Sequence, residues 1–238
     1  MKRTTFPKNS LPRSRNRPFI IAIDGPAGSG KSSTAKALAA YLKLPYIDTG
    51  AMYRALTLEA MRRKISFESV AEVVRLARKM DIGFGPMKKD VQTVYVDGKD
   101  VTKAIRTPEL TKNVVYVARE PKIRAEMVRK QRILGRKEGA VMDGRDIGTV
   151  VFPKAHFKFY FDAEPRLRAR RRYKELLEAG KKVPFKRVLE EIRERDKTDR
   201  ERKQGALRVA KGAKVIDTTG LTIQATIDKI LAFLGADL

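Results

Sequence analysis

Residues 19–33 read FIIAIDGPAGSGKSS, and this stretch decides the fold. It begins with an apolar run, continues through a glycine-rich loop that fits G-x-x-x-x-G-K-[ST], and leads into a predicted helix at residues 33–42. A buried strand that turns through glycines into a helix directs backbone N–H groups and the helix N-terminus at phosphate oxygens. With strand, spacing, lysine and serine all present, the stretch predicts a binding site for a nucleoside triphosphate.

Two side chains of the loop have a chemical role in such a site. Lys31 adds a positive charge for the β- and γ-phosphates, and the Ser32 hydroxyl can approach Mg²⁺. The predicted triphosphate-binding residues are Gly25, Pro26, Ala27, Gly28, Ser29, Gly30, Lys31, Ser32 and Ser33.

Further apolar runs follow along the chain, and each ends at or just before an aspartate. With the first, they lie at residues 19–23, 140–142, 157–161 and 214–216, and a short fifth run lies at 45–47. The stretches between them have helical periodicity. This alternation predicts an α/β fold, a three-layer core with a parallel five-stranded sheet between helices.

Residues 82–101 break this pattern and predict a small antiparallel β insert. Asp97-Gly98 stands between alternating residues, which is a strong hairpin signal. The helix before the insert is expected to open with a capping box formed by Ser69 and Glu72.

Composition limits the classes of function. The 238 residues are 42% hydrophobic and 34% charged, so the chain can bury a core, and 53 Lys+Arg against 28 Asp+Glu give a net charge of +25. That charge predicts an anionic partner. No cysteine is present, which excludes disulfides and thiolate nucleophiles, and the single histidine, His156, is expected to be structural. No apolar run is long enough to cross a bilayer, so we expect a soluble cytoplasmic protein.

Residues 1–18 are basic, contain no acid and have no apolar segment typical of a secretory signal. Three prolines interrupt the amphipathic helix that a transit peptide would need. We interpret them as a disordered arm, with a nucleic-acid contact as the alternative.

Two segments are expected at the carboxyl edge of the sheet, where open α/β sheets bind ligands. In residues 47–54, Arg54 follows Tyr53 and can clamp a second phosphate. In residues 141–149, Asp143 can hold Mg²⁺ through water, Arg145 a phosphate, and Asp146 the amine of a base. A packed aromatic ring and a structural loop salt bridge are the alternatives.

The C-terminal half contains a predicted helical lid at about residues 165–205. An apolar stripe from Phe185 to Ile192 continues as Arg195, Asp199 and Arg202, so charged side chains replace the buried face and point into a cleft. The preceding helix ends near Gly180 and presents Arg168, Arg171 and Arg172. Two basic helices joined in this way can close over a triphosphate. A solvated basic hairpin is the alternative.

The order of motifs resembles the bacterial cytidylate kinase family over residues 19–235. It runs IAIDGPAGSGKSS, IDTGAMYRA, VMDGRDIGTVVFP, FYFDAEPRLRARRR, ERDKTDRER and IDTTGLT. The resemblance implies that residues 25–33 hold ATP and that Arg168, Arg171 and Arg172 are lid arginines. It implies that Arg124 and Asp146 read cytosine and that Arg195 and Asp199 read the ribose. The residues implied to surround the monophosphate are Thr49, Tyr53, Arg54, Arg124, Arg145, Asp146, Arg195, Asp199 and Arg202.

Transfer of the γ-phosphate of ATP-Mg²⁺ to CMP and dCMP, in pyrimidine nucleotide metabolism, is the expected reaction. The expected catalytic residues are Lys31, Arg145, Arg168, Arg171 and Arg172, with Ser32 and Asp143 at the metal. The expected organisation is an arm at 1–18, a core at 19–50 and 119–238, and a monophosphate-binding region at 51–118. We expect a monomer with no membrane and no stable nucleic-acid partner.

Two positions depart from the family pattern. Val115 stands where the family commonly has a serine near the base, which should weaken cytosine recognition. Gly205-Ala-Leu207 replaces an SPL-like stretch, and we expect it to border the adenine of ATP.

Two other functions would account for part of the sequence. An adenylate- or uridylate-type kinase would share the loop and lid but would not need the insert or the DGRD block. An RNA-binding GTPase-like module would explain the charge, yet the sequence has no Asn-Lys-x-Asp segment to read guanine.

Overall fold

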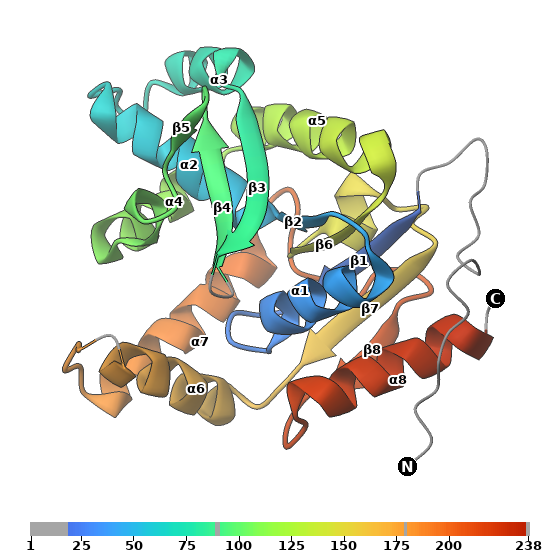
Figure 1. The fold of residues 1–238 in the computed structure, drawn as a ribbon. Coiled ribbons are helices and arrows are strands. Elements are labelled where there is room, and N and C mark those ends of the chain that lie inside the picture. The colour runs from blue at the N-terminus through green and yellow to red at the C-terminus, as the bar shows by residue number, and fades with distance from the viewer. Residues whose placement is uncertain (1–18, 89–90, 179, 237–238) are drawn as a thin grey trace.

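A parallel five-stranded sheet forms the centre of the computed structural model (Figure 1), which describes residues 19–88, 91–178 and 180–236. The basic arm predicted at residues 1–18 lies outside the described residues. The strands have the order β2-β6-β1-β7-β8 and every neighbouring pair is parallel. They are β1 (Ile20–Asp24), β2 (Tyr46–Asp48), β6 (Ala140–Gly144), β7 (Phe157–Asp162) and β8 (Lys214–Asp217). The predicted fold class is therefore confirmed.

Both faces of the central strands β1 and β6 are buried, which explains why these strands read as apolar runs. On β1, Ile20 and Ala22 belong to one core cluster, with α2 (Thr49–Arg62), α3 (Val70–Lys79) and α5 (Pro121–Glu138). Ile21 and Ile23 belong to the other, with α1 (Lys31–Leu42) and α8 (Ile223–Ala236). Successive strand residues point to opposite faces, so one run serves both layers of helices.

The insert is an antiparallel three-stranded sheet of β3 (Ile82–Lys88), β4 (Val91–Val96) and β5 (Lys99–Asp100). Asp97 and Gly98 both have positive φ, 49° and 76°, as the predicted hairpin turn requires. The insert contacts the core through Gln92, whose Nε2 donates to the carbonyl oxygen of Tyr46 at 2.7 Å. The short helix η1 (Ala104–Arg106) and α4 (Pro108–Arg119) lead from the insert to α5.

The capping box predicted at the start of α3 does not form. Ser69 is the N-cap residue, but its side chain makes no capping bond. The Glu72 amide instead donates to the backbone oxygen of Ser69 at 2.9 Å, and the Ser69 amide donates to Ser66. Backbone groups thus occupy both partners that the box would use, and the prediction was wrong.

The two predicted lid helices are α6 (Pro165–Glu178) and α7 (Phe185–Glu201), drawn in orange at the lower left of Figure 1. Ala169 of α6 packs with Val188 and Ile192 of α7 in a small separate core. This core contains the predicted apolar stripe. None of the helices in the described part of the chain has the length and apolar character that crossing a membrane requires.

Gly25 joins β1 to the glycine-rich loop, and its φ of 155° is one that side chains rarely adopt. A Cβ there would also collide with the backbone oxygen of Phe161 on the neighbouring strand. We expect Gly25→Ala to lower the free energy of unfolding by about 3 kcal/mol or more, because strain and overpacking add. Gly98→Ala is the control, since its Cβ would meet nothing within 4 Å, and should cost about 1 kcal/mol. Equal losses in urea denaturation would contradict the close approach.

Candidate active site

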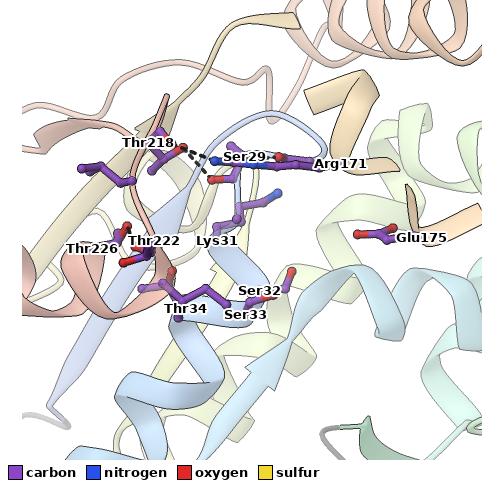
Figure 2. A pocket seen from close by; sticks show the side chains of 14 residues that line it. Ser29, Lys31, Ser32, Ser33, Thr34, Arg171, Glu175, Thr218, Thr222 and Thr226 are labelled. Carbon is purple, nitrogen blue, oxygen red and sulfur yellow. Dashed lines mark hydrogen bonds between the residues drawn. The ribbon is translucent and has the colours of Figure 1, made fainter. Parts of the chain in front are cut away.

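A pocket of about 410 Å³ lies over the glycine-rich loop (Figure 2). Its lining comes from the loop and first turn of α1, from Arg171 and Glu175 of α6, and from residues 218–226 after β8. In the described structure no side chain caps α1 at Gly30, so the first N–H groups of this helix are left for an anion. Of the predicted triphosphate-binding residues, the pocket is lined by Gly28, Ser29, Gly30, Lys31, Ser32 and Ser33.

Pro26 and Ala27 support the loop from the backbone. The carbonyl oxygen of Pro26 accepts from the Ser29 hydroxyl and from Lys31 Nζ, each at 3.0 Å. Lys31 is only 5% exposed. Burial, followed by the neighbouring positive charge of Arg145, lowers the pKa of Lys31 to about 7. A lysine in this position gains from any anion that enters the pocket.

Ser32 and Asp143 meet beside the loop. The Ser32 hydroxyl donates to Asp143 Oδ2 at 2.6 Å, the Tyr46 hydroxyl donates to Oδ1 at 2.8 Å, and Thr49 Oγ1 donates to the Asp143 carbonyl at 2.8 Å. Burial, then the charge of Asp48, raises the pKa of the Asp143 carboxyl. A buried carboxylate and a hydroxyl beside a phosphate loop are the hard oxygen donors that fit Mg²⁺, which needs few protein ligands when phosphates supply the others.

Three arginines, Arg145, Arg195 and Arg202, surround Asp199 on α7, and Arg54 of α2 lies near Arg195. Arg145 Nε donates to Asp199 Oδ2 at 2.6 Å, and Arg202 donates to Oδ1. Burial opposes ionisation of Asp199, but Arg145, Arg202 and Arg195 outweigh it and lower its pKa to about 2. The pKa of Arg195 falls to about 10, first because protein atoms crowd water from its guanidinium and then because Arg145 lies near, with Arg54 and Arg202 further contributors. The side chain of Arg195 as a whole remains exposed.

Two of these arginines have an unused donor. Arg54 Nε and Arg202 Nε are buried and have no hydrogen-bond partner within the described structure. A buried donor without a partner is costly. An incoming anion with several acceptor oxygens would satisfy both and relieve the repulsion among the guanidinium groups.

The start of α2 holds the other predicted acceptor residues. Asp48 caps the helix by accepting from the Ala51 amide at 2.8 Å, and it accepts from Arg54 at 2.9 Å. Tyr53 is buried, which raises its pKa to about 12, and the Arg124 guanidinium lies 5.4 Å from its ring centroid.

Arg124 and Asp146 form a buried ion pair. Arg124 Nη1 also donates to the carbonyl oxygen of Ala118 at the end of α4, at 3.0 Å. Val115 lies one helical turn earlier on α4 and is half-buried. The structure therefore brings together the two residues expected to read the base, and it places Val115 on the helix that supports them.

The expectation for residues 205–207 was wrong. Gly205 lies against Arg124 and Asp146, where a Cβ would collide with both side chains, and Leu207 donates its amide to the Asp199 carbonyl at 2.8 Å. The segment therefore lies beside Arg124 and Asp146 and does not line the pocket over the glycine-rich loop. The backbone hydrogen bond from Leu207 to α7 fixes the position of this segment. No residue spacing in the sequence predicts that bond.

The three predicted lid arginines differ in their exposure and in their contacts. Arg171 lines the pocket and donates to the Thr218 carbonyl at 2.8 Å (Figure 2). Arg172 is exposed and pairs with Glu175. Arg168 is 1% exposed, is bidentate to Asp196 of α7, and also donates to Ala27 of the loop at 3.1 Å. In this structure Arg168 joins the lid helices to the loop and does not face the pocket, which corrects the grouping of all three as phosphate contacts.

Sequence reasoning missed several residues that hold the site. They are Asp24, Tyr46, Asp48, Arg132 and Asp196. Asp24 and Asp48 end strands, and the recurrence of aspartate at strand ends was a signal that could have found them. The ring of His156, which we expect to be structural, lies 5.2 Å from that of Phe19.

The family model described as Cytidylate kinase matches residues 21–235. The chain belongs to the cytidylate kinase family. It is 48% identical over 210 residues to the cytidylate kinase of Caldanaerobacter subterraneus subsp. tengcongensis, covering 88% of this chain and 92% of that protein. It is 47% identical over 211 residues to the cytidylate kinase of Bacillus subtilis, covering 89% and 94%. The chain is therefore a transferase of the nucleotide kinase type that acts on small-molecule nucleotides.

A solved structure of an uncharacterized protein from Eubacterium ventriosum shares the fold, with a TM-score of 0.52 and 14% identity. The likeness covers 92% of this chain and 99% of that one.

The buried pair of Arg168 and Asp196 should contribute to the free energy of unfolding. Asp196→Ala should lower the free energy of unfolding by about 3–5 kcal/mol, because it leaves the Arg168 guanidinium buried and unpaired. Glu191→Ala on the same helix removes the partner of Arg187 in an exposed pair and should cost less than about 1 kcal/mol. Similar losses in the two variants, measured by chemical denaturation, would contradict the role given to Arg168.

Proposed function

We propose that this chain transfers the γ-phosphate of ATP-Mg²⁺ to the 5′-phosphate of CMP, and of dCMP, giving ADP and CDP or dCDP. The observation that supports it most is the convergence of Arg145, Arg195 and Arg202 around the carboxylate of Asp199, with Arg54 close enough to lower the pKa of Arg195. This excess of positive charge stands next to Lys31, whose pKa Arg145 and Arg195 also lower. A positively charged site next to the triphosphate pocket fits a second phosphate group, that of the acceptor nucleotide.

On the donor side, residues 25–33 hold the triphosphate. Backbone amides of the loop and of the α1 N-terminus bind phosphate oxygens, and Lys31 exchanges its bond to Pro26 for the β- and γ-phosphates. Ser32 would hold Mg²⁺, with Asp143 acting through water. The metal ion would supply charge neutralisation between the phosphates.

On the acceptor side, Arg54 and Arg145 hold the acceptor phosphate in line with the donor. Their guanidinium groups have the geometry for bidentate contacts to phosphate oxygens. Arg195 and Asp199 bind the ribose, with Arg202 completing the cluster. Thr49 and Tyr53 form the floor of this half, and Thr49 is fixed by its bond to Asp143.

The reaction needs positioning more than proton transfer. The oxygen of the acceptor phosphate is already anionic at neutral pH, so no strong general base is required. Lys31, Arg145 and Arg171 stabilise charge on the transferring group, and Arg172 joins them when the lid closes. Arg168 keeps the lid helices in register with the loop through Asp196 and Ala27.

Arg124 and Asp146 read the base. Cytosine presents an amine donor beside two acceptors, so Asp146 accepts from the amine and Arg124 donates to the acceptors. Uracil would place a carbonyl oxygen opposite the carboxylate, where two acceptors repel. The methyl groups of Val115 supply no hydrogen bond to help.

We also propose the organisation that goes with this reaction. Residues 19–50 and 119–238 form the core, residues 51–118 form the monophosphate-binding region, and the chain acts as a cytoplasmic monomer. Its substrates are small molecules, with no stable nucleic-acid partner.

The role of Lys31 is tested by removing its charge. Lys31→Ala should keep the fold and lower kcat by about 10² or more, because Lys31 neutralises charge that develops in transfer. Lys137→Ala, at an exposed lysine in the last turn of α5, is the matched control and should retain full turnover. Circular dichroism checks folding, and near-normal turnover in a folded Lys31→Ala would refute the donor site.

Substrate choice is tested with a panel of monophosphates. We expect kcat/KM for CMP and dCMP to exceed that for UMP by about 10² or more, with AMP and GMP excluded by size. Asp146→Asn should narrow the CMP/UMP gap by about tenfold, because an amide can donate to the uracil carbonyl. Equal use of UMP and CMP by the unmodified protein would overturn the substrate, as would salt-sensitive RNA binding without kinase activity.

A further inference from the structure

Asp24 is a buried carboxylate to which the proposed reaction gives no direct contact with a nucleotide. It ends β1, directly before the glycine-rich loop, and is 3% exposed. Its Oδ1 accepts from the Ile147 amide at 2.8 Å and its Oδ2 from the Gly148 amide at 2.7 Å. Both oxygens are therefore used by one segment more than 120 residues further along the chain.

That segment is η2 (Ile147–Val151), a single π-helical turn. Its opposite end is also held from outside, because Arg132 of α5 donates through Nη2 to the Val150 carbonyl at 2.8 Å and through Nε to the Val151 carbonyl at 2.9 Å. π-Helical turns are rare and occur frequently at functional sites. Here two side chains from other elements bond the free N–H groups at one end and the free carbonyls at the other.

The clamped turn directly follows Arg145 and Asp146. The backbone oxygen of Asp146 closes the turn by accepting from the amides of Val150 and Val151, at 2.8 and 3.1 Å. The position of η2 therefore sets the backbone from which Arg145 reaches Asp199 and Asp146 reaches Arg124.

There is little free space where Asp24 approaches this turn. A Cβ on Gly148 would lie 3.3 Å from Asp24 Oδ2 and 3.1 Å from the Cβ of Ala210. A carboxylate offers an acceptor to each N–H group, whereas an amide of the same shape offers one acceptor and turns an NH₂ group towards the second N–H.

We infer that Asp24, acting with Arg132, is a positioning residue for the acceptor half of the reaction: it holds η2 so that Arg145 and Asp146 face phosphate and base. Because Asp24 also begins the glycine-rich loop, the same carboxylate fixes the distance between the donor and acceptor sites. The inference rests on the proposed function only for what Arg145 and Asp146 bind.

The test replaces Asp24 by its isosteric amide. Burial raises the pKa of the Asp24 carboxyl to about 7, so the assays are run at pH 8, where the carboxyl is mostly ionised. Under these conditions Asp24→Asn should speed hydrogen exchange of the Ile147 and Gly148 amides by about tenfold or more. It should lower kcat/KM for CMP by about tenfold or more and narrow the CMP/UMP ratio, because small misplacements of reacting groups are costly. A merely structural loss would reduce the active fraction and leave that ratio unchanged.

The matched control is Asp162→Asn. Asp162 ends the adjacent strand β7, but it is exposed, and among the described residues its carboxylate accepts from the amide of the next residue at 2.9 Å. This variant should keep the exchange rates and the substrate ratio of the unmodified protein. If it instead shifts them as Asp24→Asn does, the effect belongs to any strand-end aspartate and the inference is wrong.

Arg132→Met provides an independent variant should Asp24→Asn fail to fold. It removes both bonds at the other end of η2 and should raise exchange in residues 147–151 and narrow the CMP/UMP ratio in the same direction. The inference is overturned if either folded variant leaves both exchange and ratio unchanged while Asp146→Asn changes the ratio. If Asp146→Asn also leaves the ratio unchanged, the proposed base reader fails, and the exchange rates alone decide whether Asp24 holds the turn.

Discussion

Repulsion among closely packed guanidinium groups is the constraint on which the site depends. Arg145, Arg195 and Arg202 share the carboxylate of Asp199, and Arg54, which is paired with Asp48, lies near Arg195. Burial, followed by the charge of Arg145, lowers the pKa of Arg195, and the buried Nε atoms of Arg54 and Arg202 have no hydrogen-bond partner among the described residues. A folded protein keeps such a group of like charges only where other contacts hold it in place. The arrangement is therefore prepared for an anion before any nucleotide enters.

Aspartates provide most of that support, and they do so in two ways. At the carboxyl edge of the sheet, Asp24, Asp48 and Asp143 use their oxygens on backbone amides, hydroxyls and one arginine. In the lid, Asp196 neutralises the buried Arg168 and leaves Arg171 to line the pocket. Parallel strands end at one edge, so short carboxylates there can reach segments that are distant in the sequence.

Periodicity and local motifs predicted much of this molecule. The strands were visible because burial on both faces makes a continuous apolar run, and the turn at Asp97-Gly98 was visible because its backbone demands positive φ. The capping box at Ser69 and the placement of Gly205 were predicted wrongly. Each of these predictions depended on which of several possible partners a backbone group would hydrogen-bond. The sequence nearby offered several equivalent partners.

The sequence by itself determined the phosphate loop, the sheet flanked by helices, the β insert and the family, because each depends on residue spacing along a strand, turn or helix. Only the tertiary structure decided which charges pair. Arg168 and Arg171 look alike in the sequence, yet one is buried against Asp196 and the other lines the pocket. Likewise Asp24 shows its two partners only when β1 and β6 lie side by side. Pairing between distant residues is fixed by packing in three dimensions, and no local period records it.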